Sequence, residues 1–260
     1  MRKINNITII GSGNVGTEFG KKLYQAGYNI DGVFGYRIES GKNLAKETSS
    51  KFFSNKTEIP SESDLYLIAL KDDLYIETLK GINLEGKLII HTSGSLESKA
   101  LNSFSNRWGC IYPLQSISKN RKVNWNSFKT YIEASNTKDE NALIELCETL
   151  ELNFSKADSN QRKKIHLAAV ASNNFTYHLL SNIREFCEEN KLEYQDFKNL
   201  ISQSVDNSLL EKVYQLQTGP AKRKDVKLIE NQIKMVKDNK NLKDIYELFT
   251  QQILNKHHEL

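Results

Sequence analysis

The segment GSGNVG near the start of the chain constrains the fold more than any other part of the sequence. It follows the short apolar run 7–10 and precedes an amphipathic stretch over about residues 15–25. In a strand–loop–helix unit, Gly11 permits a tight turn, Gly13 lets the backbone approach a diphosphate, and Gly16 lets the helix lie close to the strand. The amides that open the helix then face the phosphates. The alternative is a glycine-rich turn with only a packing role. We predict a dinucleotide site whose loop residues are Gly11, Ser12, Gly13, Asn14, Val15 and Gly16.

The residues after the second predicted strand, 30–34, indicate which dinucleotide is bound. NAD enzymes carry Asp or Glu there for the ribose hydroxyls, whereas this chain has Tyr36, Arg37 and Ser40. An acid would repel a 2'-phosphate, while Arg37 attracts it and can stack on adenine. Ser40 can add a hydrogen bond. These residues favour NADP as the cofactor, and Glu39 keeps NAD as the less favoured alternative.

The first half of the chain alternates β-branched runs with amphipathic stretches, which is typical of βαβ units and a parallel sheet. The strands are predicted near residues 7–10, 30–34, 65–70, 88–91, 109–112, 130–134 and 153–156. The helices between them are predicted near 15–25, 41–48, 72–80 and 138–150. Ligands of such sheets lie at the carboxyl ends of the strands. The residues predicted to border the nicotinamide end of the cofactor are Ala69, Leu70, Lys71, Thr92 and Ser93.

Beyond residue 158 the β-branched runs disappear and helical periodicity continues to the end. Apolar residues recur at intervals of three and four over 165–186, which predicts one long helix. Further helices are expected over 194–216, 225–237 and 242–255. The predicted fold class is therefore α/β: a Rossmann, doubly wound, mostly parallel sheet over residues 1–157, followed by an all-helical substrate and dimerisation domain over 158–260.

Composition argues against other classes of function. The net charge of +4 arises from 36 basic and 32 acidic residues spread along the chain, which is typical of a lysine-rich surface and not of a nucleic-acid partner. Cys110, Cys147 and Cys187 form no CxxC pair, which indicates a reducing, cytoplasmic location. The sequence contains no run of 18 apolar residues, so no membrane span is predicted. It also contains no metal-ligand motif, so no metal site is predicted.

Five motifs together resemble one known group of proteins. They are IIGSGNVG, IIHTSGS, IYPLQSIS, HLAAVASNNFTYHL and QTGPAKRKD. In this order they are similar to the Rossmann-like NADP oxidoreductases that carry a C-terminal helical domain of unknown function. Wider relatives include pyrroline-5-carboxylate reductase, ketopantoate reductase and the 3-hydroxyacid dehydrogenases. The resemblance covers nearly the whole chain and implies the fold, NADP, and a homodimer built from the helical domains, but no agreed substrate.

The chain departs from two of these relatives at one position. The ketopantoate and 3-hydroxyacid enzymes place a catalytic lysine about one turn before an asparagine on the long helix, where this chain has Ala169 or Val170. Their mechanism therefore does not transfer directly, and a non-catalytic NADP-binding or sensor protein is the alternative to an enzyme.

Hydride transfer needs a proton donor and groups that orient the acceptor. On a wheel of 100° per residue, His166, Val170, Asn173 and Tyr177 form one stripe beside the apolar arc of the long helix. His166 is a candidate acid, Asn173 a candidate to orient substrate, and Tyr177 a candidate substrate contact. The alternative is that these groups hydrogen-bond inside a dimer interface.

Other candidates lie in loops. His91 ends a strand near the expected nicotinamide and is either a proton donor or, as we favour, a hydrogen-bonding partner of the cofactor ribose. Gln115 is either a substrate contact or part of a structural turn. Thr218, Lys222 and Arg223 precede a predicted helix and either bind an anionic substrate group or face solvent. We predict an NADP(H)-dependent oxidoreductase of a C=O or C=N bond in a small, anionic metabolite.

Overall fold

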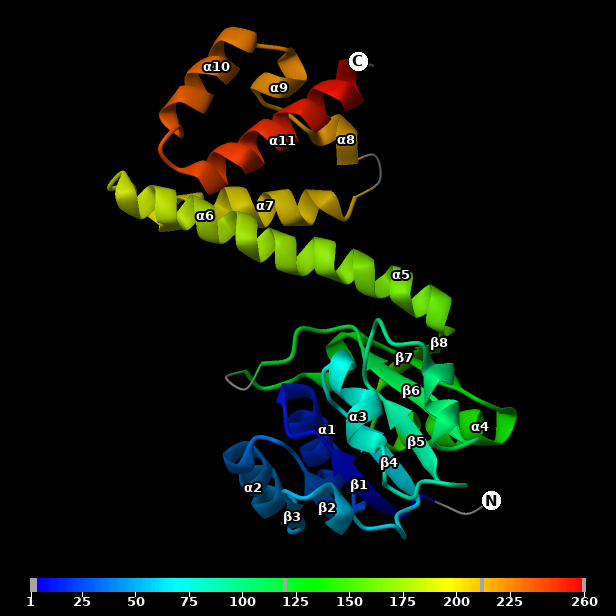
Figure 1. The fold of residues 1–260 in the computed structure, drawn as a ribbon. Coiled ribbons are helices and arrows are strands. Elements are labelled where there is room, and N and C mark those ends of the chain that lie inside the picture. The colour runs from blue at the N-terminus through cyan, green and yellow to red at the C-terminus, as the bar shows by residue number, and fades with distance from the viewer. Residues whose placement is uncertain (1–3, 119–120, 211–212, 259–260) are drawn as a thin grey trace. The chain divides into compact units, whose positions relative to one another are not determined.

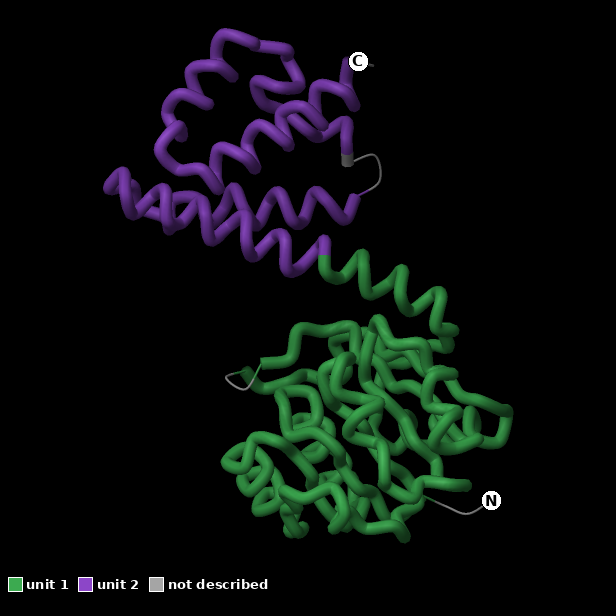
Figure 2. The backbone as a smooth tube through the Cα atoms, in the orientation of Figure 1, with its two compact units in different colours: residues 1–170 green, residues 171–260 purple. Residues whose placement is uncertain are grey.

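The chain forms two compact units, residues 1–170 and 171–260 (Figure 2). The computed structural model describes residues 4–118, 121–210 and 213–258. The predicted domain boundary follows the last strand, whereas the division between the units falls at Val170, inside the long helix. The first turns of that helix belong to the first unit because Ser159 and Arg162 make contacts with Glu133 of the sheet.

The first unit contains one eight-stranded sheet (Figure 1). Its strands are β1 (Asn6–Ile10), β2 (Asn29–Phe34), β3 (Lys51–Phe53), β4 (Leu65–Ile68), β5 (Leu88–His91), β6 (Trp108–Pro113), β7 (Lys129–Ala134) and β8 (Asn153–Lys156). Their order is β3-β2-β1-β4-β5-β6-β7-β8, and every neighbouring pair is parallel except β6 and β7. The doubly wound, mostly parallel sheet that we predicted is confirmed. The prediction omitted the short strand β3.

The register of the central strands aligns their carboxyl ends. Ile10 pairs with both Phe34 and Ile68, and Ile68 pairs with His91. The four loops that follow these strands therefore start at the same edge of the sheet. The strand order reverses between β1 and β4, which is where open α/β sheets bind ligands.

Both faces of the sheet are buried, as expected for parallel strands covered by helices. Alternate residues of β1 and β4 join different cores: Ile9 and Leu67 lie in one, Ile10 and Ile68 in the other. The helices that contribute side chains to the first core are α1 (Asn14–Gln25), α2 (Ile38–Glu47) and α4 (Thr137–Thr149). Helix α3 (Tyr75–Leu79) contributes to the second core. The sheet is thus fixed on both sides, and its loops are built on a rigid base.

The long helix is continuous but not uniform. Helix α5 (Ser159–Ala169) passes through a π-helical segment, η5 (Val170–Phe175), into α6 (Thr176–Glu189). A π turn is wider than an α turn and shifts the phase of everything that follows it. The wheel that placed Asn173 and Tyr177 in line with His166 is therefore wrong beyond Val170.

The second unit is helical, as predicted. After α6 it contains η6 (Tyr194–Phe197), α7 (Lys198–Ser208), α8 (Val213–Leu216), α9 (Pro220–Arg223), α10 (Val226–Met235) and α11 (Lys240–His258). The helix predicted over 194–216 is divided, and residues 211–212 lie outside the described part of the chain. The predicted loop after Thr218 contains the short helix α9, which Pro220 starts. Within the described residues, none of the helices is both long and apolar enough to cross a membrane.

Candidate active site

A cavity of about 440 Å³ lies at the carboxyl ends of the central strands. It is lined by Gly11, Ser12, Gly13, Asn14, Val15, Tyr36, Arg37, Ala69, Leu70, Lys71, Leu74, Thr92, Ser93 and Ile117. Every predicted cofactor residue except Gly16 and Ser40 belongs to this lining. The structure therefore brings the predicted cofactor residues together from four loops, because β1, β2, β4 and β5 end at one level, and Ile117 comes from a fifth loop, after β6.

The glycine loop has the geometry that a diphosphate requires. Gly11 has φ +113°, and a Cβ there would lie 2.2 Å from the carbonyl oxygen of Ala69. A Cβ on Gly16 would lie 2.0 Å from the carbonyl oxygen of Gly11, so helix and loop approach too closely for a side chain. At Gly13, in contrast, a Cβ would meet nothing within 4 Å. Gly13 thus leaves space beside the backbone that opens α1, and no side-chain bond caps that helix start. Phosphate oxygens fit there.

The residues after β2 fit an adenosine 2'-phosphate. Arg37 is exposed at the start of α2 and lines the cavity with Tyr36. The Tyr36 hydroxyl lies 2.8 Å from Oγ1 of Thr78, which holds its ring in place. The hydroxyls of Ser12 and Ser40 lie 3.0 Å apart, so Ser40 reaches the cavity wall through Ser12. A cation and hydroxyl groups are suited to bind a phosphate.

The opposite wall of the cavity is formed by the loops after β5 and β6. Thr92 and Ser93 belong to the first loop and Ile117 to the second. The side-chain amide of Asn14 donates to the Ile117 carbonyl oxygen over 3.0 Å, which ties the second loop to the glycine loop. Gln115 is exposed and lines an adjoining cavity of about 200 Å³ that shares Ile117.

His91 is buried beneath this wall and is bonded on both ring nitrogens. Its Nδ1 atom accepts from the backbone amide of Ser93 at 3.1 Å, and its Nε2 atom lies 2.8 Å from Oγ of Ser98. Burial, with a smaller effect of the Arg162 charge, lowers the pKa of His91 to about 3. The ring is therefore neutral. Because Nδ1 accepts, Nε2 carries the proton and donates to Ser98. Both nitrogens are thus engaged inside the protein.

His166 forms a pair with Tyr112, which the sequence interpretation missed. The Tyr112 hydroxyl lies 3.0 Å from Nδ1 of His166, and the two rings meet edge to face. The imidazole also packs on Gly94, where an added Cβ would lie 2.5 Å from Nδ1. Burial raises the pKa of Tyr112, so its hydroxyl keeps its proton at neutral pH. Because Gly94 follows Ser93 of the cavity wall, the pair lies near the loop at which the sequence predicts the nicotinamide.

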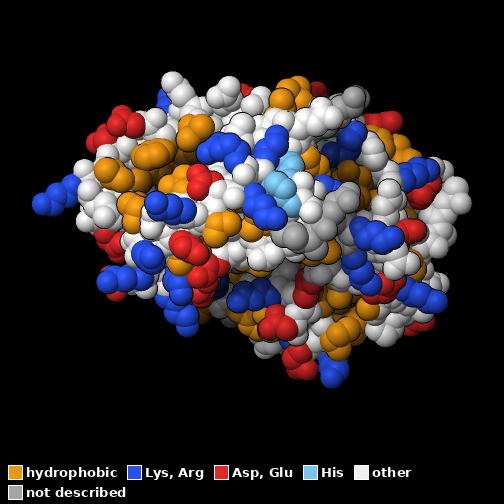
Figure 3. Space-filling model, turned by 90° about the horizontal axis from the view of Figure 1, so that it is seen from above, with side chains coloured by type: hydrophobic (Ala, Val, Ile, Leu, Met, Phe, Trp, Pro, Cys, Tyr) orange, Lys and Arg blue, Asp and Glu red, His pale blue; other side chains and the backbone are white. Residues whose placement is uncertain are grey.

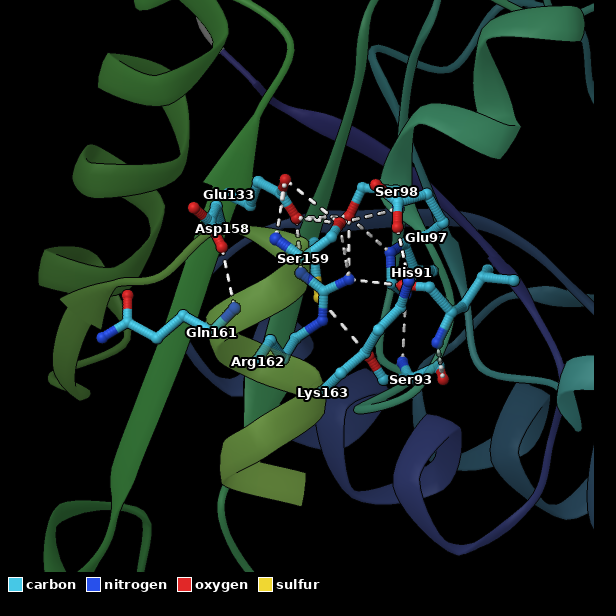
Figure 4. A network of polar contacts seen from close by, with 12 residues as sticks. His91, Ser93, Glu97, Ser98, Glu133, Asp158, Ser159, Gln161, Arg162 and Lys163 are labelled. Atoms are coloured by element: carbon cyan, nitrogen blue, oxygen red, sulfur yellow. Dashed lines mark hydrogen bonds and ion pairs between the residues drawn. The ribbon is translucent and has the colours of Figure 1, made fainter. Parts of the chain in front are cut away.

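A network of polar contacts joins α5 to the sheet (Figure 4). Arg162 is fully buried and forms an ion pair of 2.5 Å with Glu133 of β7. It also donates to the Leu96 carbonyl oxygen and to Oγ of Ser98 and Ser159. The sequence interpretation missed both charged residues. A signal existed, since Glu133 falls between apolar residues of a predicted strand, but the sequence pattern named no partner for it.

The remaining predicted site residues lie in the second unit. Asn173 bonds its neighbour Asn174, and Tyr177 is 55% exposed. Lys222 donates to the carbonyl oxygens of Gln215 and Gln217 at 3.1 and 2.6 Å. Its ammonium group thus satisfies backbone acceptors of its own unit. Thr218 lines a separate cavity of about 440 Å³, and Arg223 is exposed.

Comparisons with known proteins agree with this architecture. Residues 6–94 match the family model "NADP oxidoreductase coenzyme F420-dependent", and residues 129–253 match a "Domain of unknown function (DUF2520)". Among curated proteins, none matches the chain.

Three solved structures illustrate the likeness. A "putative NADP oxidoreductase" from Bacteroides fragilis is 33% identical, with a TM-score of 0.88 over 96% of this chain and 98% of that one. A reductive aminase from Aspergillus terreus, solved with NADPH and ethyl levulinate, is 14% identical, with a TM-score of 0.72 over 99% and 95%. A pyrroline-5-carboxylate reductase from Coxiella burnetii is 16% identical, with a TM-score of 0.56 over 99% and 98%. The last two share the fold. The first, with the two family matches, shows that this chain belongs to the NADP oxidoreductases that join a Rossmann domain to a C-terminal DUF2520 domain.

Proposed function

We propose that the protein is an NADPH-dependent reductase of a C=O or C=N bond in a small, anionic metabolite. The observation that carries the proposal is the contact of 3.0 Å between the Tyr112 hydroxyl and Nδ1 of His166. A neutral phenol bonded to an imidazole, beside the wall of a dinucleotide cavity, is suited to give a proton to a bound acceptor. A protein that only sensed NADP would not need this arrangement.

Reduction requires a hydride at the acceptor carbon and a proton at its oxygen or nitrogen. NADPH, when bound, supplies the hydride and is converted to NADP⁺. In our proposal Nδ1 of His166 donates its hydrogen to the Tyr112 oxygen, which leaves the hydroxyl proton for the acceptor heteroatom. When Tyr112 gives that proton to the acceptor, His166 passes its Nδ1 proton to the phenolate and takes up a proton from solvent at Nε2. His91, which is neutral and doubly bonded, holds the Ser93 amide and takes no part in proton transfer.

The proposed substrate class draws on two kinds of support. The Aspergillus and Coxiella structures that share this fold are named as a reductive aminase and a pyrroline-5-carboxylate reductase, which favours C=N as well as C=O acceptors. The cavity around Gln115 also contains Arg121 and Lys122 and adjoins the cofactor cavity. These cations can bind a carboxylate or phosphate. We assign anion recognition to them because the Lys222 ammonium group is bonded within its own unit.

We also propose a homodimer formed through the helical unit. Large apolar side chains of that unit are exposed, among them Leu200 at 61%, Leu209 at 82% and Leu248 at 55%. Figure 3 shows hydrophobic side chains at several places on one face of the molecule, among Lys and Arg side chains. Light scattering should give about twice the chain mass of 29.8 kDa. A monomeric mass at micromolar concentration would contradict the dimer.

Turnover tests the proposed activity directly. The purified protein and NADPH are mixed with small oxo acids, cyclic imino acids, or oxo acids plus an amine, and the loss of NADPH absorbance is followed. The Tyr112→Phe/His166→Gln double variant is the matched control, since it keeps the cavity lining. We expect at least one acceptor to be reduced by the wild type and not by the control. NADPH binding without turnover of any acceptor would favour the non-catalytic sensor.

A further inference from the structure

Glu133 of β7 and Arg162 of α5 form the centre of a polar network with more hydrogen bonds than a helix needs to be attached to a sheet. Glu133 accepts through Oε2 from Arg162 at 2.5 Å and from Ser98 Oγ at 2.6 Å, and through Oε1 from the Ser159 amide at 3.1 Å. Replacing a buried ion pair by apolar residues is often neutral or stabilising. Stability alone therefore does not explain why the fold carries this pair.

The hydrogen bonds between the cavity wall and the ion pair all have the same direction, from the donor at Ser93 to the acceptor at Glu133. The Ser98 hydroxyl donates to Glu133 and accepts from His91 Nε2, and His91 Nδ1 accepts from the Ser93 amide. The direction of every hydrogen bond between them is fixed, because the Ser93 amide can only donate and the Glu133 carboxylate can only accept. The charge on Glu133 thus fixes the tautomer of His91 and, through it, the backbone at Ser93.

The same ion pair also fixes the helix that carries His166. Arg162 lies one turn before His166 on α5, so the two side chains share a face of the helix. The Arg162 guanidinium bonds the Leu96 carbonyl oxygen, and the Ser159 hydroxyl accepts from the Ser98 amide. Helix α5 therefore holds the loop that contains Gly94. The same helix carries His166, whose ring packs on that glycine.

We propose that Arg162 and Glu133 are positioning residues of the reductase, which hold the Tyr112–His166 pair and the loop 92–96 in one fixed relation. This inference rests on the proposed function. It adds that the precision of the proton-donating pair depends on a charged network that touches neither cofactor nor substrate. Hydrogen-bonding partners of metal-ligating residues typically change activity by about 10- to 100-fold when they are altered, and we expect an effect of similar size here.

The test uses the conservative variants Arg162→Lys and Glu133→Gln and the double variant Arg162→Met/Glu133→Leu in the full-length protein. The double variant removes both charges together, so it leaves no unpaired buried charge if a single variant fails to fold. Nitrogen-15 NMR of the His166 ring reports its tautomer and the hydrogen bond at Nδ1, with His166→Gln providing the assignment. NADPH affinity is measured by fluorescence titration. The values of kcat and KM are measured with any acceptor that the wild type reduces.

We expect all folded variants to bind NADPH within about threefold of the wild type. The His166 ring resonances should move and broaden, and kcat should fall by about 10- to 100-fold with little change in KM. Arg162→Lys keeps the charge but not the forked geometry. It should therefore resemble the double variant and fail to restore kcat.

Lys163→Met is the matched control. Lys163 is the next residue on α5 and forms an ion pair of 2.5 Å with Glu97 (Figure 4). The side chains of this pair are 41% and 50% exposed. Lys163 links the same helix to Glu97, the residue that directly follows the loop 92–96. Loss of this ion pair should leave the His166 resonances and kcat unchanged. Equal effects of Lys163→Met and Glu133→Gln would overturn the proposal, as would His166 resonances that stay unchanged in all network variants. If no acceptor is ever reduced, the proposed function fails while the NMR result still decides the positioning.

Discussion

The hydroxyl of Tyr112 on β6 and Nδ1 of His166 on α5 lie 3.0 Å apart although 54 positions separate them in the chain. The antiparallel junction between β6 and β7 and the helix after β8 bring them together. The pair belongs to the first unit, and the His166 ring packs on Gly94, the residue that follows Ser93 of the cavity lining. The cofactor cavity and the proposed proton donor thus belong to the same unit and depend on the same sheet.

Tyr112→Phe removes the proton donor while keeping the ring. We expect kcat to fall by about 100-fold or more, since a positioned acid contributes about 10²- to 10⁴-fold. NADPH affinity should be unchanged, because Tyr112 does not line the cavity. Steady-state kinetics and fluorescence titration measure the two effects. Tyr131→Phe, on the neighbouring strand, is the control, and a similar loss there would count against a special role of Tyr112.

Arg37→Ala should reduce the preference for NADPH over NADH. A hydrogen bond to a charged group contributes about 1.5–3 kcal/mol, so NADPH should bind about 10- to 100-fold more weakly while NADH binding stays the same. Titration of both nucleotides measures the ratio. Lys42→Ala provides a matched control, because Lys42 is an exposed cation on the same helix outside the cavity lining. An unchanged ratio in Arg37→Ala would refute the assignment of the 2'-phosphate.

How much of this site was predictable depends on the distance over which its residues interact. The glycine loop and Arg37 were predictable because one strand, one turn and one helix determine their geometry. Tyr112 lies inside the motif IYPLQSIS, yet nothing local in the sequence links it to His166. Its partner depends on strand pairing and on where α5 starts, and neither has a local signal.

The buried ion pair and the π turn were missed for related reasons. Arg162 and Glu133 are 29 positions apart, and periodicity alone places an arginine of an amphipathic helix on its solvent face. The wheel assumed 100° per residue throughout, but η5 breaks that phase. Site residues beyond Val170 were therefore aligned with His166 by a rule that the helix does not follow.

Gly13→Ala and Gly11→Ala should separate binding from folding. Gly13 has φ −72° and open space at Cβ, so alanine should leave the unfolding temperature without ligand unchanged or slightly raised. The methyl group would occupy the space for the diphosphate, and NADPH affinity should fall by at least about tenfold. Gly11→Ala, in contrast, places a side chain at φ +113° against the Ala69 carbonyl. It should lower the unfolding temperature even without NADPH.

Thermal unfolding with and without NADPH distinguishes the two variants. Gly81→Ala is the control for backbone strain at a position outside the cofactor cavity. Gly81 has φ +84°, and a Cβ there would meet nothing within 4 Å. It should lower stability moderately and leave the NADPH-induced rise in unfolding temperature intact. Normal NADPH binding by a folded Gly13→Ala variant would contradict the location of the diphosphate.

His91 should make stability depend on pH. Its pKa is about 3 in the folded protein because the ring is buried, compared with 6.5 in the unfolded chain. Between these values the unfolded chain binds the extra proton, so the free energy of unfolding decreases as the pH falls below 6.5. The largest slope from one such group is about 1.4 kcal/mol per pH unit. Above pH 6.5 the contribution is complete and constant.

Urea unfolding of the wild type and His91→Gln between pH 7.5 and about 5 measures this effect, in a window above the titration of most carboxyl groups. Glutamine keeps a donor toward Ser98 but does not titrate. It should therefore lower stability at pH 7.5, because the acceptor for the Ser93 amide changes, yet show a smaller loss toward pH 5 than the wild type. Parallel pH profiles for the two proteins would mean that His91 takes up a proton in the folded state. In that case Nδ1 of His91 would not accept from the Ser93 amide, and the proposed chain of hydrogen bonds from Ser93 to Glu133 would be wrong.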